Sequence, residues 1–316
     1  MDISKYHWQE SVASRQVLIQ IEALKLTLLS LPRLKTNYGI LRTASLLKSA
    51  VYSARIEGFP DTEQNPQKVS QNLLKAYNFL ISTPQKKLSV ALIKNLHRKV
   101  LDNISSSAGH FRTEPWAVYD QFGSAIYLAP LHIQIPGLLS DYLSYLENSQ
   151  NHPLINAAIA QFIFEKIHPF ADGNGRVGRL ISAFLLKVSG YHFDYLIPLE
   201  EYIENHKDVY YSSLIPSHDL TEFINFFLTA LIEQGKAVIL AAQQDTLPTT
   251  NLLSPRRQEI LAILKDHPHA SFDFIHRRFL NLNPKTLHYD LGQLIKRGFI
   301  QKAGITRGVT YIIKNN

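Results

Sequence analysis

Residues 168–179 read His-Pro-Phe-Ala-Asp-Gly-Asn-Gly-Arg-Val-Gly-Arg and lie between two stretches of helical periodicity. The spacing of apolar residues on either side is that of an amphipathic helix. These apolar positions are Ile155, Ile159, Phe162 and Ile163 before the segment, and Val177, Leu180, Ile181, Phe184 and Leu185 after it. Because Pro169 disfavours helical geometry at His168, we expect the first helix to end there. The segment is therefore predicted to be a glycine-rich turn at the start of the second helix.

This turn has the composition of an anion-binding site. The N–H groups at a helix N-terminus lack helical acceptors, and Gly173 and Gly175 let a phosphate approach the backbone closely. Asp172 offers a hard oxygen ligand for Mg²⁺. Arg176 and Arg179 lie on the same first helical turn, and their planar guanidinium groups suit terminal phosphates. The segment predicts phosphoryl-group chemistry, in which positioning and charge neutralisation supply most of the catalysis.

His168 adds a base to this site. Its side chain titrates near neutral pH and can take the proton from an incoming hydroxyl, a step typically worth about 10²–10⁴ in rate. The alternative is a structural Asp-Gly-Asn-Gly turn with His168 at a helix end and with solvated arginines. That alternative explains each residue alone, but it does not explain why all of them fall within residues 168–179.

At every defined position these residues resemble the motif of the Fic family, His-x-Phe-x-Asp/Glu-Gly-Asn-Gly-Arg-x-x-Arg. The resemblance implies a mainly α fold, a Fic-type helical bundle with a small β-hairpin flap. It implies an enzyme, a nucleotidyltransferase that moves AMP from ATP to a Ser, Thr or Tyr hydroxyl of a target protein and releases pyrophosphate. Another donor, such as UTP or CDP-choline, stays open because the phosphate cradle contacts the diphosphate and not the base.

The same resemblance assigns roles to the residues of the motif. His168 would be the catalytic base and Asp172 the ligand of Mg²⁺. Phe170 would pack into the core. The ATP-binding residues of the motif would be Gly173, Asn174, Gly175, Arg176 and Arg179.

A hairpin is predicted upstream of the motif. The β-prone runs Trp116–Tyr119 and Ala125–Leu128 are joined by the turn-forming residues 120–123. With the preceding Gly-His-Phe-Arg of residues 109–112, the hairpin resembles the flap with which Fic proteins position a target segment by strand pairing. The docking edge implied by this resemblance consists of Ile126, Tyr127, Leu128 and Ala129.

A second segment downstream resembles the family's Asn-x-x-x-x-Tyr-Tyr sequence, which lies near the adenine. It contains Asn205 and the pair Tyr210-Tyr211. The resemblance assigns Asn205 and Tyr210 to ATP binding. The alternative is that two tyrosines on an amphipathic helix fill the core.

Residues 53–58, Ser-Ala-Arg-Ile-Glu-Gly, resemble the family's inhibitory motif, Ser/Thr-x-x-x-Glu-Gly/Asn, in the class where it precedes the catalytic core. The resemblance makes Ser53 and Glu57 inhibitory, because an ion pair between Glu57 and Arg179 would occupy the arginine that the γ-phosphate needs. Glu57 could also position a water that removes AMP from modified targets. The alternative is a surface helix that ends in a glycine C-cap, with Glu57 in solvent.

The C-terminal part of the chain carries the excess positive charge. Residues 252–316 contain 11 Lys or Arg and 4 Asp or Glu, an excess that equals the formal net charge of +7 for the whole chain. Helices are predicted at 255–266, 271–280 and 284–297, and strands at 299–303 and 309–313, on either side of a wing at 304–308. This order is typical of a winged helix-turn-helix. Such modules bind DNA, bind proteins or dimerise, and the fold alone does not decide between them.

If the third helix enters a major groove, the residues near its start face the bases and basic residues around it meet phosphates. The candidate base contacts are Lys285, Thr286, His288 and Tyr289, and the candidate phosphate contacts are Arg277, Arg278 and Arg307. We place the domain boundaries from the turn-rich stretch before this module. They give an N-terminal helical region at 1–85, a catalytic core at 86–242, a linker at 243–255 and a winged-helix domain at 256–316.

Composition limits the class of protein further. The chain has no cysteine, so it has neither disulfides nor thiolate metal sites, and we expect a cytoplasmic location. The polar residues among the first twenty exclude a signal-peptide core, and no apolar run approaches the roughly 18 residues of a membrane helix. A second class of function is a DNA-binding regulator whose Fic body senses a nucleotide, but the intact His168 favours the enzyme. A homodimer, the target protein and the relieving signal stay open.

Overall fold

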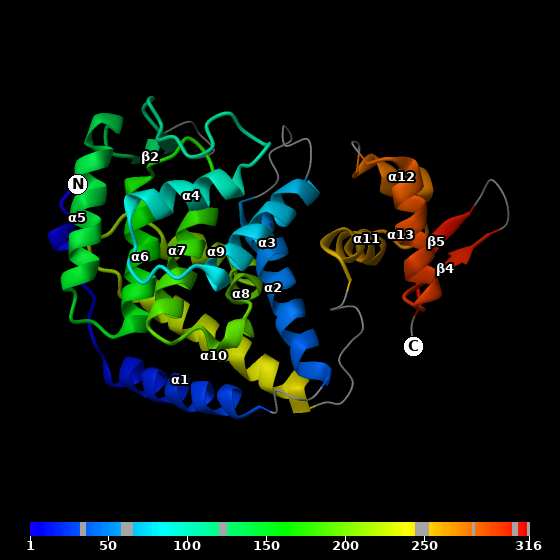
Figure 1. The fold of residues 1–316 in the computed structure, drawn as a ribbon, viewed down its shortest axis with the longest axis horizontal. Helices are drawn as coiled ribbons and strands as arrows, with labels where there is room; N and C mark the ends of the chain where they lie inside the picture. The colour runs from blue at the N-terminus through cyan, green and yellow to red at the C-terminus, as the bar shows by residue number, and fades with distance from the viewer. Residues whose placement is uncertain are drawn as a thin grey trace.

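The computed structural model describes residues 1–31, 36–57, 66–119, 125–243, 253–279, 282–304 and 309–314. The described part is mainly helical, as the sequence predicts (Figure 1). Its α-helices are α1 (Val12–Ser30), α2 (Thr36–Ile56), α3 (Pro66–Ser82), α4 (Val90–Val100), α5 (Ile135–Asn148), α6 (Pro153–Ile167), α7 (Asn174–Val188), α8 (Leu199–Asn205), α9 (Lys207–Ser213), α10 (Thr221–Gln243), α11 (Pro255–Asp266), α12 (Phe272–Arg277) and α13 (Pro284–Lys296). The 3₁₀ turns are η1 (Ile3–Lys5), η2 (His132–Gln134) and η3 (Phe193–Tyr195), and the strands are β1 (Ala117–Tyr119), β2 (Ala125–Leu128), β3 (Ala270–Ser271), β4 (Ile300–Ala303) and β5 (Thr310–Ile313).

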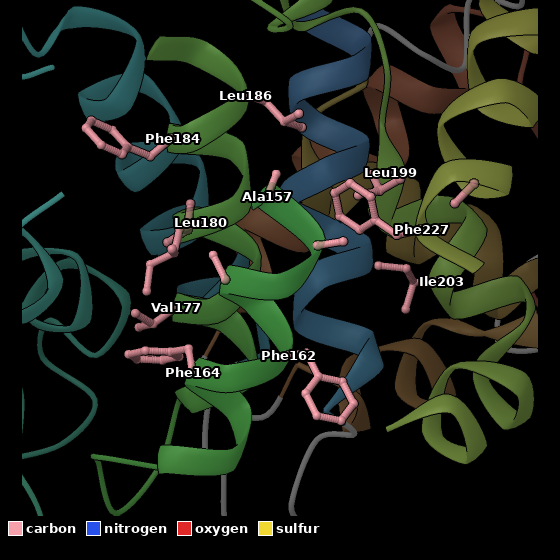
Figure 2. Packing of buried hydrophobic residues seen from close by; sticks show 14 of the residues in the cluster. Ala157, Phe162, Phe164, Val177, Leu180, Phe184, Leu186, Leu199, Ile203 and Phe227 are labelled. Atoms are coloured by element: carbon pink, nitrogen blue, oxygen red, sulfur yellow. The ribbon is translucent and has the colours of Figure 1, made fainter. Parts of the chain in front are cut away.

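Helices α6 and α7 form the centre of the main helical body. α6 is buried over most of its circumference because it is apolar nearly all round, and Pro153 at its first turn suits a helix start. It ends at Ile167, so the predicted break at His168 is confirmed. Figure 2 shows Phe164 of α6 beside Val177 of α7, and Leu199 of α8 with Phe227 of α10 on the other side of the same core.

The N-terminal helices belong to the same core as the catalytic segment. Apolar side chains of α1 and α3 are buried in this core, including Ile21, Leu28 and Leu73. α2 packs against α3 and α8, and α1 packs against α10. One apolar cluster, from Ile3 to Val238, contains residues from both sides of the predicted boundary between residues 85 and 86. The helix that carries the inhibitory segment is therefore fixed to the body that carries the catalytic motif.

By length and composition, residues Thr221–Ala242 of α10 could cross a membrane, which the sequence analysis did not anticipate. Their most apolar window has a mean hydropathy of 1.4 and is 61% buried inside the structure. The core helix of a globular protein passes the same test. Packing against α1, α6, α8 and α9 accounts for the apolar composition of α10.

The predicted hairpin is present. Strands β1 and β2 pair antiparallel, with Val118 opposite Tyr127 and an irregularity between Val118 and Tyr119. The residues of the turn at 120–124 lie outside the described part of the chain.

A second apolar cluster lies in the described C-terminal part of the chain and includes Leu253, Ile275, Leu291 and Tyr311. Helices α11 and α13 match the first and third predicted helices closely, whereas α12 ends at Arg277, short of the predicted Leu280. A short strand, β3, was not predicted; it joins a sheet of order β3-β5-β4. The wing residues 305–308 lie outside the described residues, and a DNA-binding winged helix stays a prediction.

Candidate active site

The glycine-rich turn is held by its own residues. Gly173 is the N-cap of α7 and has a φ of 78°, a left-handed conformation that favours glycine. The side chain of Asn174 spans the turn: its Oδ1 accepts the N–H of Phe170 at 2.9 Å, and its Nδ2 donates to the carbonyl of Phe170 at 2.8 Å. The ring of Phe170 is buried, as predicted. Asn174 thus shapes the cradle with its side chain, and its part in ATP binding stays a prediction.

His97 of α4 contacts the turn through hydrogen bonds and ring stacking, a role that the sequence analysis missed. Its Nδ1 accepts the N–H of Gly109 at 2.8 Å, so its Nε2 donates to the carbonyl of Asp172 at 3.0 Å. The imidazole stacks on Phe170 with ring centroids 3.6 Å apart. Burial lowers the pKa of His97 to about 4, which keeps the ring neutral, and the two hydrogen bonds fix its tautomer. No local motif marks His97, because its partners lie far away in the sequence.

His168 caps α6 in a left-handed conformation, with φ 47° and ψ 59°. Its Nδ1 lies 3.2 Å from the carbonyl oxygen of Glu165, the geometry of a donor, so Nε2 is the nitrogen that can accept a proton. Burial lowers the pKa of His168 to about 4. The indole of Trp116 stacks on the imidazole with ring centroids 3.5 Å apart. His168 is therefore a neutral base at physiological pH.

Arg112 joins the flap to the catalytic turn. Its guanidinium donates to three carbonyls: Nε to His168 at 2.7 Å, Nη1 to Glu114 at 2.9 Å and Nη2 to Pro130 at 2.5 Å. Glu114 and Pro130 flank the two ends of the hairpin. The Tyr127 hydroxyl also donates to the carbonyl of Lys166 in α6. The geometry ties the position of the hairpin to that of the base.

The structure brings Ser53 and Glu57 to Arg179, as the resemblance implies. Arg179 Nε donates to Ser53 Oγ at 3.0 Å, and its Nη2 donates both to the carbonyl of Ser53 at 2.9 Å and to Glu57 Oε1 at 2.8 Å. The Arg179 side chain is 1% exposed, and that of Glu57 is 30% exposed. Burial disfavours the charged guanidinium, yet Glu57 and other neighbours outweigh it and raise the pKa of Arg179. A buried arginine of this kind requires an anionic partner.

Glu57 also occupies the predicted anion site. A Cβ built on Gly175 would stand 2.0 Å from Glu57 Oε1, so the carboxylate lies directly against the backbone of the first turn of α7. Only glycine permits this approach. The carboxylate therefore lies where the helix N-terminus attracts negative charge.

Asp172 and Arg176 contact each other in this structure. Arg176 Nη2 lies 2.7 Å from each carboxylate oxygen of Asp172, and Gly173 N donates to Asp172 Oδ1 at 2.6 Å. The Asp172 side chain is half exposed, and that of Arg176 is buried. Among the described residues no group of three or more His, Cys, Asp or Glu could hold a metal ion. Asp172 alone fits a Mg²⁺ whose remaining ligands are phosphate oxygens and water.

A cavity of about 610 Å³ opens beside the base, lined by His168, Trp116, Glu57, Glu165, Tyr210 and Tyr211 among others. Tyr210 is buried and its hydroxyl accepts from Gln161 at 3.1 Å, so it also fills the core. Asn205 is exposed at the end of α8 and does not line the cavity. Tyr211 does line it, and its hydroxyl donates to the carbonyl of Ile56 at 2.8 Å.

Glu165 is a second carboxylate in this cavity, which the sequence analysis also missed. Burial, with a further contribution from Glu57, raises the pKa of Glu165 to about 8. Its Oε1 is buried and has no hydrogen-bond partner among the described residues. A charged pair inside an otherwise apolar helix, Glu165 and Lys166, was the available signal.

The candidate DNA contacts lie on the surface of the C-terminal unit. Lys285 and His288 are exposed, Tyr289 is 61% exposed, and Thr286 is half-buried. Arg277 and Arg278 at the end of α12 are also exposed. Arg307 lies outside the described residues. Contact with DNA stays a prediction.

The middle of the chain matches a known protein family. Residues 87–186 match the model of the Fic/DOC family. The chain is 31% identical over 152 residues to protein adenylyltransferase fic-1 of Caenorhabditis briggsae, covering 46% of this chain and 28% of that protein. It is 27% identical over 227 residues to protein adenylyltransferase Fic of Aedes aegypti, covering 66% and 42%. The chain thus spans less than half the length of these curated relatives.

Solved structures share the fold. A Fic family protein from Desulfovibrio desulfuricans superposes with a TM-score of 0.64 at 19% identity, over 98% of both chains. Fic-1 from C. elegans superposes with a TM-score of 0.58 at 22% identity, over 73% of both chains. The motif, the helical architecture and the family match agree. Residues 87–186 of this chain therefore form a Fic domain of the Fic/DOC family.

Proposed function

We propose that this chain is a protein adenylyltransferase that moves AMP from ATP to a hydroxyl side chain of a target protein and that Glu57 restrains it. The single observation that carries the proposal is the arrangement of Arg179, Gly175 and Glu57 around one anion site next to a neutral His168. The names of the relatives support ATP as donor. The lack of cysteine supports a cytoplasmic location.

In the proposed reaction, His168 Nε2 takes the proton of the target hydroxyl as its oxygen attacks the α-phosphorus. The bond from that phosphorus to the bridging oxygen breaks, and pyrophosphate leaves with its electron pair. The N–H groups at the start of α7 stabilise the charge that develops on the phosphate oxygens. The flap, fixed by Arg112, presents the target segment beside the base. Mg²⁺ held by Asp172 would neutralise phosphate charge.

Inhibition follows from competition for one guanidinium. Arg179 is buried and charged, so it binds either the Glu57 carboxylate or a phosphate of ATP. While Glu57 is in place, its carboxylate lies against Gly175 and repels a phosphate at the same position. ATP that binds beside it cannot adopt the pose needed for attack at the α-phosphorus. Removal of Glu57 should therefore release the activity.

The test is transfer of label from ATP to protein, including self-modification, with the label placed at the α-phosphate or at the γ-phosphate. We expect weak transfer of α-label by the wild type, and transfer about tenfold stronger or more by Glu57→Gly, as loss of about 1.4 kcal/mol of inhibition gives. His168→Ala and the double variant should transfer none. The matched control is Glu233→Gln, which removes a surface ion pair with Lys236 and should leave transfer at the wild-type level.

Two outcomes contradict the proposal. If γ-label is transferred, the enzyme moves a phosphoryl group and not AMP. If Glu57→Gly binds ATP but transfers no label to itself or to lysate proteins, the donor is another nucleotide or the chain is a nucleotide-sensing regulator.

A further inference from the structure

An ion pair connects the C-terminal unit to the inhibitory helix. Arg55 Nη2 of α2 donates to Glu259 Oε2 of α11 at 2.6 Å. Both side chains are largely shielded, 24% and 31% exposed. α11 also packs against α3, which lies beside α2 (Figure 1). Arg55 stands two residues before Glu57 in the sequence, so this contact fixes the backbone immediately before the inhibitory carboxylate.

Residues of α9 also contact the same short segment. Lys207 Nζ in α9 donates to the carbonyl of Arg55 at 3.0 Å, and the Tyr211 hydroxyl donates to the carbonyl of Ile56 at 2.8 Å. These carbonyls lie at the C-terminal end of α2, where helical partners are missing. The Glu259 contact differs from them because it comes from a separate apolar core. The position of Glu57 thus depends on both units of the chain.

α11 is in turn fixed to α13, the helix with the candidate DNA contacts. Both carboxylate oxygens of Asp290, which is buried, accept from arginines of α11: Oδ1 from Arg257 Nε at 2.8 Å, and Oδ2 from Arg256 Nε. Arg257 also lies over the ring of Tyr289, 5.6 Å from its centroid. A buried carboxylate bonded to two arginines resists separation of the two helices. A displacement of α13 therefore moves α11, and with it Glu259.

We propose that the C-terminal unit is part of the inhibitory device, and that the Glu259–Arg55 pair stabilises the position of α2 in which Glu57 reaches Arg179 and Gly175. An event that draws α11 away from α2 then raises AMP transfer. The inference rests on the proposed adenylyltransferase function. A chain of contacts does not by itself show that Glu259 affects Glu57, so the test compares single and double variants of these two residues.

The experiment compares full-length wild type, Glu259→Gln, Glu57→Gly and the double variant in transfer of α-label. A partly exposed ion pair shifts an equilibrium by about two- to fivefold, so Glu259→Gln should raise transfer by that factor in the wild-type background. It should have no effect in the Glu57→Gly background, where no inhibitory carboxylate remains. The exchanged pair Arg55→Glu/Glu259→Arg should return transfer toward the wild-type level. Glu147→Gln, which removes an exposed pair with Lys87, is the matched control.

Amide hydrogen exchange of residues 51–57, measured without nucleotide, separates this proposal from the proposed function. It should be about two- to fivefold faster in Glu259→Gln than in the wild type. Unchanged exchange overturns the proposal, whatever the labelling shows. Faster exchange with unchanged labelling, while Glu57→Gly is strongly active, also overturns it and leaves inhibition by Glu57 intact. If Glu57→Gly itself is inactive while exchange responds as expected, the contact stands and the proposed activity fails.

Discussion

The indole of Trp116 lies over the imidazole of His168, with ring centroids 3.5 Å apart and ring planes 24° apart. Trp116 directly precedes the first strand of the flap, and His168 ends α6. The indole shields the base from water, and burial is the first cause of its lowered pKa. The hairpin segment therefore contributes to the low pKa of His168, in addition to the target docking proposed for it.

Trp116→Ala should shift the acidic limb of the pH profile of kcat/KM to higher pH. The pKa of His168 is about 4, against an ordinary value of 6.5, so the base stays unprotonated down to about pH 4. In the Glu57→Gly background, kcat/KM should fall only near pH 4, where His168 becomes protonated. Trp116→Ala should raise the limb toward pH 6, whereas Trp116→Phe, which keeps a ring, should move it less. Glu165 is present in the Glu57→Gly parent and in both Trp116 variants, so it does not account for a difference between them. An acidic limb that does not move in Trp116→Ala contradicts the role of the indole.

Gly175→Ala should abolish transfer in a way that Glu57→Gly cannot rescue. The added Cβ stands 2.0 Å from Glu57 Oε1, in the space where the proposed phosphate approaches the backbone. We expect the variant to lose about 10²-fold or more in transfer, as a misplaced reacting group does. Transfer and ATP affinity should be measured with and without Glu57→Gly. A double variant as active as Glu57→Gly alone would show that phosphate and carboxylate do not share this position.

Tyr211→Phe should activate the enzyme. It removes the hydroxyl that donates to the carbonyl of Ile56 at 2.8 Å but keeps the ring that lines the cavity. A hydrogen bond of this kind contributes about 0.5–1.5 kcal/mol, so transfer should rise about two- to tenfold. The rise should vanish in the Glu57→Gly background. An equal rise in both backgrounds would place the effect in nucleotide binding instead.

His97 should make the free energy of unfolding depend on pH. Its folded pKa of about 4 lies below its ordinary value of 6.5, so the unfolded chain binds more protons between these two values. Stability is therefore complete above about pH 6.5 and is lost as pH falls toward 4, by about 2–3 kcal/mol. His97→Gln should remove this part of the pH dependence, leaving the part due to His168, whose pKa is also about 4. It should also lower kcat, because glutamine cannot support Gly109 and Asp172 in the same way. Urea unfolding at several pH values, with His132→Gln as control, measures the slope.

The sequence predicted the elements that local pattern determines. The break at His168 follows from the proline after it, and the hairpin near Trp116 follows from short-range spacing. The resemblance to the inhibitory motif also predicted the ion pair between Glu57 and Arg179, which residue spacing alone cannot reveal.

What the sequence could not predict depends on tertiary packing. The support of the turn by His97 requires α4 to lie beneath it, and nothing in the local sequence around His97 indicates this. The side-chain amide of Asn174 bonds the backbone of Phe170, a contact that the motif did not indicate, and its place in the ATP-binding cradle stays a prediction. Asn205 is exposed at the end of α8 and is not among the residues that line the cavity, and its contact with ATP stays a prediction. The contact between Arg55 and Glu259 crosses two separate cores and has no signature in either segment.

The order of these parts along the chain bears on synthesis. Glu57 precedes the catalytic turn, so the restraining carboxylate has left the ribosome before Arg179 is made. Each new molecule thus folds its Fic core with the restraint already present. Glu259 is made after the whole Fic domain, so its contact with Arg55 forms later than the contact of Glu57 with Arg179. In the proposed mechanism, the Glu57–Arg179 pair restrains the transferase from the time its core folds, and the Arg55–Glu259 pair adds to this restraint only later.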